Sequence, residues 1–276
     1  MIARGVPVAE ALDSARIAIG AAGSDTPRLD AELLLAHALG VPRSALVMDP
    51  GREVTGEATR AFRDLVRRRS AAREPVAYLI GRRGFRHIDL EVDARVLVPR
   101  PETEDLVEVG LALPAGVRVA DVGTGSGAIA LALKHERPDL DVLATDISAD
   151  ALDVARANAA RLGLDVTFVH GDLLDGVGSV DAVLCNPPYV ASGDAVAPEV
   201  AHEPRLALDG GPDGLDVIRR LVAAGAQAGA ATLALEVGIG QADAVAALLH
   251  PRWVHVEIRP DLAGIPRVVH GWTRRS

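Results

Sequence analysis

Residues 118–127, RVADVGTGSG, join an apolar run to a turn in which glycine recurs at every second position, at Gly123, Gly125 and Gly127. Glycine lets the backbone turn sharply from a strand into a helix and come close to a ligand. The free N–H groups at the start of the following helix then face that ligand. Because a glycine-rich turn can also serve packing alone, the surrounding sequence has to decide between these interpretations.

Segments that resemble strands and helices alternate after this stretch. Apolar runs at 141–146, 165–172 and 181–185 are separated by helical patterns, the first of which begins at Ala149. We expect a helix near 213–226, a strand from Thr232, and a helix near 240–249. This order predicts a parallel, doubly wound α/β sheet.

The last two predicted strands, VHVEIR (254–259) and RVVHGW (267–272), are joined by a segment too short for a helical crossover. They should therefore be antiparallel neighbours. Seven strands with an antiparallel end are typical of the class I (Rossmann-like) S-adenosylmethionine-dependent methyltransferase sheet. We predict that fold, with a small N-terminal helical domain.

We predict three parts in the chain. Residues 1–81 have helical periodicity, for example at Leu29, Leu33 and Ala36, and no catalytic cluster, so we expect a domain that docks the substrate. Residues 82–98 should form a β-hairpin linker, with strands at 88–92 and 96–98. Residues 99–276 should form the catalytic domain.

Composition excludes several classes of protein. The single cysteine, Cys185, allows no internal disulfide, and no Cys/His spacing suits a metal site. We predict no signal peptide and no membrane span, and a cytoplasmic location. The net charge of −9 argues against stable nucleic-acid binding. A local basic patch at Arg67–Arg69 is possible, but a solvated helix face is the more ordinary interpretation.

Two carboxylates favour an adenosine cofactor. Asp146 ends the second predicted strand 23 positions after Gly123, where it can accept both hydroxyls of a ribose. Asp172 ends the third strand, within reach of an adenine edge. The pattern is GxGxG, and no lysine follows it as in a phosphate-binding loop. S-adenosylmethionine fits this combination best.

The fourth predicted strand runs into CNPPYV, residues 185–190. The prolines stiffen the backbone, so the side-chain oxygen of Asn186 and the carbonyl of Pro187 can be held as two fixed acceptors. A planar NH2 group would donate both hydrogens to them and lie against the ring of Tyr189. Such acceptors stabilise the positive charge that develops on a weakly nucleophilic nitrogen during methylation, without a metal or a strong base. Alone, this stretch could equally be a rigid turn.

These motifs together resemble the HemK/PrmC family, class I methyltransferases that modify the glutamine of the GGQ motif in class I peptide-chain release factors. The resemblance covers most of the chain. It rests on RLDAELLLAHAL, EPVAYLIGRRGF, VLVPRPETEDLVE, DVGTGSGAIALAL, NPPYV, EVGIGQ and DLAGIPRVV.

The resemblance implies a role for each matching residue. The cofactor would be bound by Asp121, Gly123, Thr124, Gly125, Ser126, Gly127, Asp146, Asp172, Leu173 and Asn186. The glutamine amide would be held by Asn186, Pro187, Pro188 and Tyr189, of which Asn186, Pro187 and Tyr189 are the catalytic candidates. Arg100, Pro101 and Glu102 would form the wall of the substrate pocket. Some relatives have an aromatic residue where this chain has Leu173, so adenine stacking should be weaker there.

The leading hypothesis is N5-methylation of a release-factor glutamine. A glutamine methyltransferase of a ribosomal protein remains open. An adenine-N6 methyltransferase would use the same clamp, but it predicts a basic surface that the net charge disfavours. A cofactor-binding partner without turnover is the alternative that is not an enzyme.

Overall fold

The computed structural model describes residues 5–273, which divide into two compact units. The helical unit comprises the described residues up to Arg82 together with Val196–His202. The sheet unit comprises Arg83–Ala195 and the described residues from Glu203. The helical unit is therefore assembled from two separate stretches of sequence.

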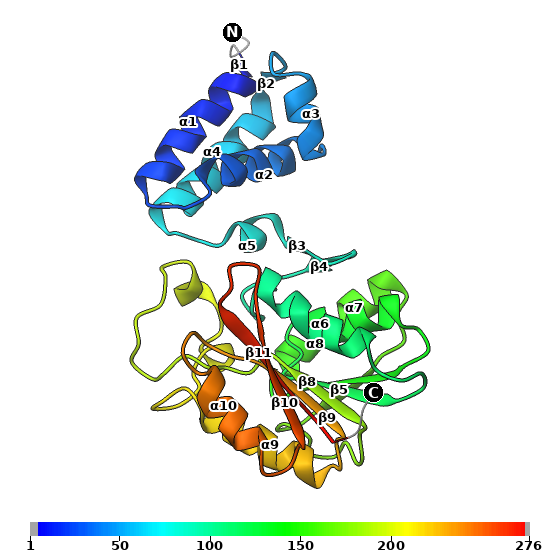
Figure 1. Ribbon diagram of the computed structural model, residues 1–276. Helices are drawn as coiled ribbons and strands as arrows, with labels where there is room; N and C mark the ends of the chain where they lie inside the picture. The colour runs from blue at the N-terminus through cyan, green and yellow to red at the C-terminus, as the bar shows by residue number, and fades with distance from the viewer. Residues whose placement is uncertain (1–4, 274–276) are drawn as a thin grey trace. The chain divides into compact units, whose positions relative to one another are not determined.

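The helical unit consists mainly of helices (Figure 1), which pack around an apolar core that includes Ile19, Leu34 and Phe62. Its elements are β1 (Val6–Pro7), α1 (Val8–Ala21), α2 (Pro27–Leu39), α3 (Arg43–Met48), β2 (Glu53–Val54), α4 (Gly56–Ala71) and α5 (Val76–Ile80). Strands β1 and β2 pair with each other. The prediction for the face of α2 is partly wrong, because Leu34 and Leu35 are fully buried whereas Leu29 is exposed. The run LLLAHAL is apolar almost all round, so periodicity could not select the buried face.

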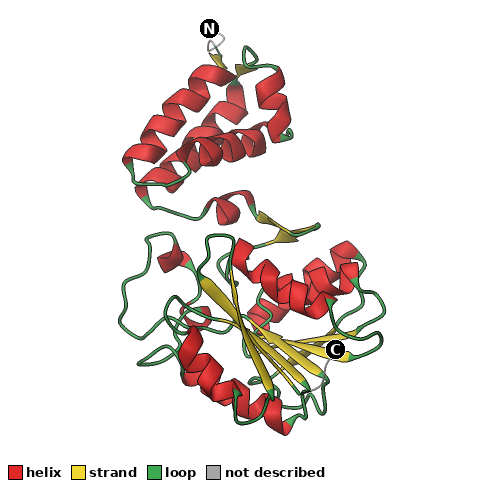
Figure 2. Cartoon of the chain, viewed as in Figure 1, coloured by secondary structure: helices red, strands yellow, loops and turns green. Residues whose placement is uncertain are grey.

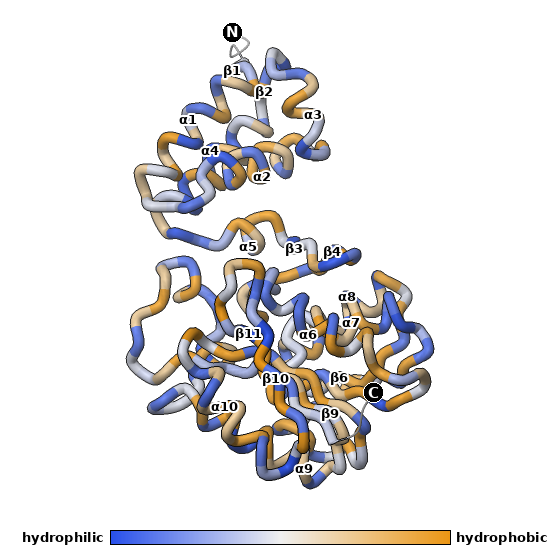
Figure 3. The backbone as a smooth tube through the Cα atoms, in the orientation of Figure 1, coloured by the Kyte–Doolittle hydropathy of each residue, from blue (hydrophilic) through white to orange (hydrophobic). Residues whose placement is uncertain are grey.

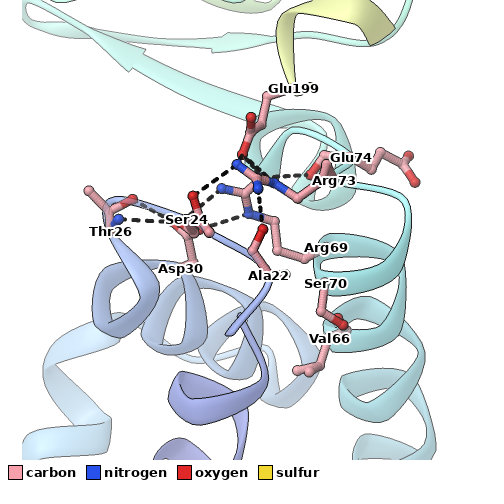
Figure 4. A network of polar contacts seen from close by, with 11 residues as sticks. Ala22, Ser24, Thr26, Asp30, Val66, Arg69, Ser70, Arg73, Glu74 and Glu199 are labelled. Carbon is pink, nitrogen blue, oxygen red and sulfur yellow. Dashed lines mark hydrogen bonds and ion pairs between the residues drawn. The ribbon is translucent and has the colours of Figure 1, made fainter. Parts of the chain in front are cut away.

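A buried arginine joins the two stretches of the helical unit (Figure 4). Arg69 donates from Nε to Asp30 (2.7 Å), from Nη1 to Glu199 (2.9 Å) and from Nη2 to the hydroxyl of Ser24 (3.0 Å). Arg73 also donates to Glu199, at 2.8 Å and 2.5 Å. Glu199 is thus held by two guanidinium groups. Their attraction keeps the pKa of Glu199 below its usual value, even though burial acts in the opposite direction and more strongly than any single contact.

The arginine run 67–69 does not form a free basic patch. Arg67 pairs with Asp64 at 2.7 Å, Arg68 pairs with Glu74, and Arg69 is buried. Each positive charge in this run already has a carboxylate partner, which leaves little to attract a phosphate backbone.

The sheet unit contains a seven-stranded sheet in the order β10-β11-β9-β8-β5-β6-β7 (Figure 2). The strands are β5 (Arg118–Val122), β6 (Asp141–Asp146), β7 (Thr167–His170), β8 (Ala182–Cys185), β9 (Thr232–Glu236), β10 (His255–Pro260) and β11 (Pro266–Trp272). Pairing is parallel from β7 to β9, and β11 is antiparallel to both β9 and β10. The predicted seven-stranded fold with an antiparallel end is confirmed.

Helices cover both faces of this sheet (Figure 1). One layer contains α6 (Glu104–Leu111), α7 (Ala128–Glu136) and α8 (Ala149–Leu162), and the other contains α9 (Asp216–Gln227) and α10 (Ala242–Leu249). The central strands are buried along nearly their whole length and mostly hydrophobic, as parallel strands covered on both faces are (Figure 3). Alternate residues of β8 therefore serve different layers. Leu184 lies near Gly110 of α6, whereas Val183 and Cys185 belong to the core that includes residues of α9.

The predicted hairpin lies earlier in the sequence than expected. It consists of β3 (Arg82–Phe85) and β4 (Ile88–Glu91), and residues 96–98 do not form a strand. The N–H of Val98 instead donates to the carboxylate of Glu203 at 3.1 Å. The alternation of residues 88–92 was interpreted correctly, but its partner is the preceding segment.

Candidate active site

The carboxyl ends of β5, β6 and β8 border a cavity of about 200 Å³ within the sheet unit. Eight of the predicted site residues line it: Gly123, Gly125, Asp146, Asp172, Leu173, Asn186, Pro187 and Pro188. These predicted cofactor and substrate residues therefore meet at one cavity, at the edge where open α/β sheets bind ligands. Gly127 and the catalytic candidate Tyr189 do not line it.

The glycine loop is tied to the neighbouring strand. The N–H groups of Gly123 and Thr124 both donate to the carbonyl of Thr145 in β6, at 2.9 Å. Gly123 and Gly125 have φ values of 70° and 57°, and a Cβ atom at either position would meet no protein atom within 4 Å. Since both glycines line the cavity, the absence of side chains leaves space for a ligand close to the backbone.

Asp121 lies beneath this loop and not on the cavity. Its Oδ2 accepts from the hydroxyl of Thr124 (2.6 Å) and from the N–H of Ala130 (3.0 Å), so it joins the loop to the start of α7. Burial raises its pKa to about 7. Thr124 and Ser126 are also buried, and they are absent from the cavity lining. These three residues shape the loop.

Asp146, at the end of β6, holds the far side of the loop. Its Oδ2 accepts from the N–H of Gly125, and its Oδ1 accepts from the N–H of Ser148, both at 2.9 Å. Each carboxylate oxygen can accept a further hydrogen bond. Burial raises the pKa of Asp146, while these backbone donors lower it. The carboxylate is thus rigid, and it retains two acceptor sites at the cavity.

Asp172 and Leu173 form another part of the wall. Asp172 pairs with Arg220, which also lines the cavity and was not predicted as a site residue. Leu173 has a φ of 53°, unusual for a residue other than glycine. The hydroxyl of Thr145 donates to the Leu173 carbonyl at 2.7 Å, which holds the backbone in this conformation.

Asn186 is oriented by a buried chain of hydrogen bonds that motif comparison did not reveal. Its Nδ2 donates to Oγ1 of Thr103 at 3.0 Å, and Thr103 donates to Oε2 of Glu236 at 2.6 Å. Glu236, at the end of β9, is 1% exposed, and burial raises its pKa to about 7. The hydroxyl of Tyr189 lies 3.5 Å from Oε1 of the same carboxylate, which is a weak contact.

The backbone of the NPPYV stretch is clamped by two other segments. Gln241 donates to the carbonyl of Tyr189 at 3.0 Å and accepts from the N–H of Gly238 at 2.9 Å. Val190 exchanges backbone hydrogen bonds with Leu208 and Gly210. The turn around Gly210 therefore supports the motif.

Glycine is required in that supporting turn. A Cβ atom at Gly214, which has a φ of 75°, would lie 2.3 Å from the carbonyl oxygen of Tyr189. No side chain can be accommodated so close to a backbone oxygen, so the turn packs directly against the motif.

The predicted substrate wall, Arg100, Pro101 and Glu102, is not part of the cavity lining. Arg100 pairs with Glu203, a buried carboxylate that also accepts from Val98. Burial raises the pKa of Glu203, which Arg100 opposes. Pro101 begins a 3₁₀ turn, Pro101–Thr103, that delivers Thr103 to Asn186.

Cys185 gives no sign of a reactive role. Cys185 is buried, and burial raises the pKa of its thiol, as expected for a core residue. Within residues 5–273, no group of His, Cys, Asp and Glu side chains could hold a metal ion. Among the same residues, no helix has the length and apolar character that crossing a membrane requires.

Two family models match this chain. Residues 10–81 match the PrmC N-terminal domain, and residues 103–211 match the methyltransferase small domain. The release factor glutamine methyltransferase of Deinococcus radiodurans is 46% identical over 257 residues, covering 90% of this chain and 92% of that protein. The protein of the same name from Caulobacter vibrioides is 44% identical over 270 residues, covering 91% of each chain.

Solved structures show the same fold at low identity. The methyltransferase from Pyrococcus furiosus is similar, with a TM-score of 0.51 and 16% identity, over 67% of this chain and 89% of that chain. The hMettl16 catalytic domain, solved in complex with MAT2A 3′UTR hairpin 6, gives a TM-score of 0.56 and 16% identity, over 82% and 86%.

The predicted resemblance to the HemK/PrmC family is therefore confirmed by relatives that align over most of their length. The chain belongs to the family of release factor glutamine methyltransferases.

Proposed function

We propose that this protein transfers a methyl group from S-adenosylmethionine to the side-chain amide nitrogen (N5) of the GGQ glutamine in class I peptide-chain release factors. The observation that supports this most is that Asn186 and Pro187 share one cavity with Asp146 and the glycine loop. A methyl donor and a planar amide could therefore meet without a large movement of the protein.

The residues of the cavity fit S-adenosylmethionine. The free acceptor sites of Asp146 suit the two ribose hydroxyls, and Gly123 and Gly125 leave space for the methionine part beside the loop. Asp172 and Leu173 would border the adenine. When bound, the cofactor supplies an electrophilic methyl group on a sulfonium centre.

The residues of the NPPYV stretch would bind and orient the amide. The Asn186 Oδ1 and the Pro187 carbonyl would each accept one hydrogen of the glutamine NH2 group, while the ring of Tyr189 packs against it. The amide lone pair is delocalised, so the nitrogen is a weak nucleophile. Two fixed acceptors stabilise the positive charge that develops on it in the transition state. They also hold it in line for attack, which reduces the entropic part of the barrier.

The helical unit would bind the release factor, as we predicted for residues 1–81. It presents exposed apolar side chains, including Met48 and Val47, that its own core does not use. A reaction on a translation factor occurs in the cytoplasm, where we propose that this protein works.

A transfer assay tests the proposal. Labelled methyl from S-adenosylmethionine would be followed onto a purified class I release factor, the same factor with its GGQ glutamine replaced, ribosomal proteins, DNA and RNA. We expect label on the wild-type factor alone. Label on a ribosomal protein or on nucleic acid, without label on the factor, would overturn the proposed substrate and leave the methyltransferase fold unaffected.

A further inference from the structure

Thr103 and Glu236 lie outside the predicted site, yet Thr103 contacts the inner edge of Asn186 and Glu236 in turn contacts Thr103. Thr103 is 4% exposed and Glu236 is 1% exposed, so water does not compete effectively for their hydrogen bonds. Thr103 stands at the end of the 3₁₀ turn before α6, and Glu236 at the end of β9. Two distant parts of the sequence therefore converge on one catalytic candidate.

The number of protons on these side chains determines which group donates in each of the two hydrogen bonds. When Glu236 is ionised, its carboxylate only accepts hydrogen bonds, so the single proton of the Thr103 hydroxyl must point to Glu236, which lies 2.6 Å away. Oγ1 of Thr103 can then only accept from Asn186. The Asn186 amide must present its NH2 group inward and its Oδ1 away from Thr103.

That orientation is the one the reaction needs. If the Asn186 amide were rotated by half a turn, its NH2 group would face the NH2 group of the substrate glutamine. Two donors would then face each other, and the substrate would lose the acceptor that Oδ1 provides. Asn186 alone has no preference between the two orientations, because its oxygen and nitrogen have nearly the same size and shape.

We propose that Thr103 and Glu236 are positioning residues that hold the amide of Asn186 with its oxygen toward the substrate. The inference rests on the proposed function, because it assigns them a purpose in amide methylation. Neither residue contacts the substrate in this scheme, and both act through Asn186.

The surroundings of Glu236 make this orientation sensitive to pH. Burial raises its pKa most, and Glu102 raises it further, while Thr103, Arg267 and Tyr189 lower it, with a net value of about 7. When protonated, Glu236 can donate to Thr103, whose hydroxyl can then donate to Oδ1 of Asn186 and stabilise the reversed amide. Turnover should therefore rise with pH as Glu236 ionises.

Three variants separate positioning from packing. Thr103→Val keeps the shape of the side chain but removes the hydroxyl, Thr103→Ser keeps the hydroxyl, and Thr273→Val removes a hydroxyl that contacts Ala231, away from the cavity. With the release factor as substrate, we expect Thr103→Val to lower kcat roughly tenfold or more at an unchanged KM, the scale for misplaced reacting groups. Thr103→Ser should restore most of kcat, and Thr273→Val should match wild type.

A second readout needs no turnover. The side-chain NH2 resonances of Asn186, assigned by their loss in Asn186→Ala, would be followed by nuclear magnetic resonance across the pKa of about 7 of Glu236. We expect them to titrate in the wild type and to stay constant in Glu236→Gln. The kcat profile of Glu236→Gln should also lose its acidic limb.

These experiments distinguish failure of the proposed function from failure of the positioning role of Thr103 and Glu236. If wild type fails to methylate the factor, the proposed function fails, and the resonance titration still decides the orientation. If wild type is active but Thr103→Val keeps its kcat, or if the Asn186 resonances do not respond to pH or to Glu236→Gln, the positioning role is refuted. Equal loss in Thr103→Ser and Thr103→Val would show that the side chain serves packing only.

Discussion

Asn186 and Asp146 line the same cavity, and because we propose that they contact different ligands, their removal should have separable effects. Asn186 is a candidate for contact with the methyl acceptor, whereas Asp146 is a candidate for contact with the donor. A change in kcat should therefore report on Asn186, and a change in cofactor affinity should report on Asp146.

Asn186→Ala should lower kcat by about 10²–10³-fold, or about 2.7–4 kcal/mol, the scale for losing one preorganised polar group in the transition state. Cofactor affinity measured by calorimetry should remain nearly unchanged. A variant with normal kcat would remove Asn186 from catalysis, and a large loss of cofactor affinity would assign it to the donor site.

Asp146→Ala should weaken cofactor binding by about 1.5–3 kcal/mol, the scale for one hydrogen bond to a charged group. Asp153→Ala is the control, because Asp153 is exposed and pairs with exposed Arg156 in α8. Unchanged affinity of Asp146→Ala in calorimetry would exclude the ribose role.

At this scale the sequence identified the residues that line the cavity better than those that support it. Asp146, Asn186 and the glycines stand in recognisable motifs at strand ends. Thr103, Glu203 and Glu236 act through contacts across 83 to 133 positions of sequence, and no local pattern reveals such pairings. A glutamate within an apolar strand, as in TLALEV, is the one signal that marked Glu236, because a buried carboxylate needs a partner.

Among the elements, the turn that contains Gly214 has a larger role than its sequence indicated. Gly214→Ala should reduce both stability and kcat, because its Cβ atom would displace the Tyr189 carbonyl. Gly229→Ala is the matched control, since it has a similarly positive φ of 81° and no atom within 4 Å. Both should lose about 1 kcal/mol from backbone strain. Equal unfolding curves and equal kcat for the two variants would contradict the supporting role.

Element types were predictable where the apolar pattern was long or where turns bounded it. The strands and helices from Arg118 onward agree with the sequence to within a few residues. The pairing of β4 was not predictable, because alternation identifies a strand but not its neighbour. Val98 was expected to pair with this strand, but its N–H donates to the side chain of Glu203 instead, a contact between residues far apart in the sequence.

At the scale of the whole molecule, the buried Arg69 stabilises the helical unit by joining Asp30 to Glu199. Arg69→Met should destabilise that unit by about 3–5 kcal/mol, because it leaves Asp30 without its buried cation. Arg67→Met, which breaks an exposed pair, should cost less than about 1 kcal/mol. Urea unfolding of both variants is the measurement, and similar midpoints would show that the network adds little.

Stability should also depend on pH through the buried carboxylates. The pKa of Glu236 is about 7 in the folded state and 4.5 ordinarily, so the folded state binds more protons than the unfolded state between these pH values. The free energy of unfolding should therefore fall as the pH rises from 4.5 to about 7. Glu236→Gln should therefore gain up to ~3 kcal/mol relative to wild type between those two pH values, at about 1.36 kcal/mol per pKa unit. Urea titrations at both ends test this, and a constant difference would contradict it.

The divided sequence of the helical unit has a consequence for dissection of the protein. A gene fragment that ends at Arg82 lacks Glu199, and one that begins at Arg83 carries Glu199 without Arg69 or Arg73. Neither half therefore contains the whole ion-pair network around Glu199. When the two fragments are co-expressed, they should associate by fragment complementation, because Val196–His202 of the second fragment packs in the helical unit. For the same reason, the two fragments should stay associated after a protease cleaves the chain at Arg82.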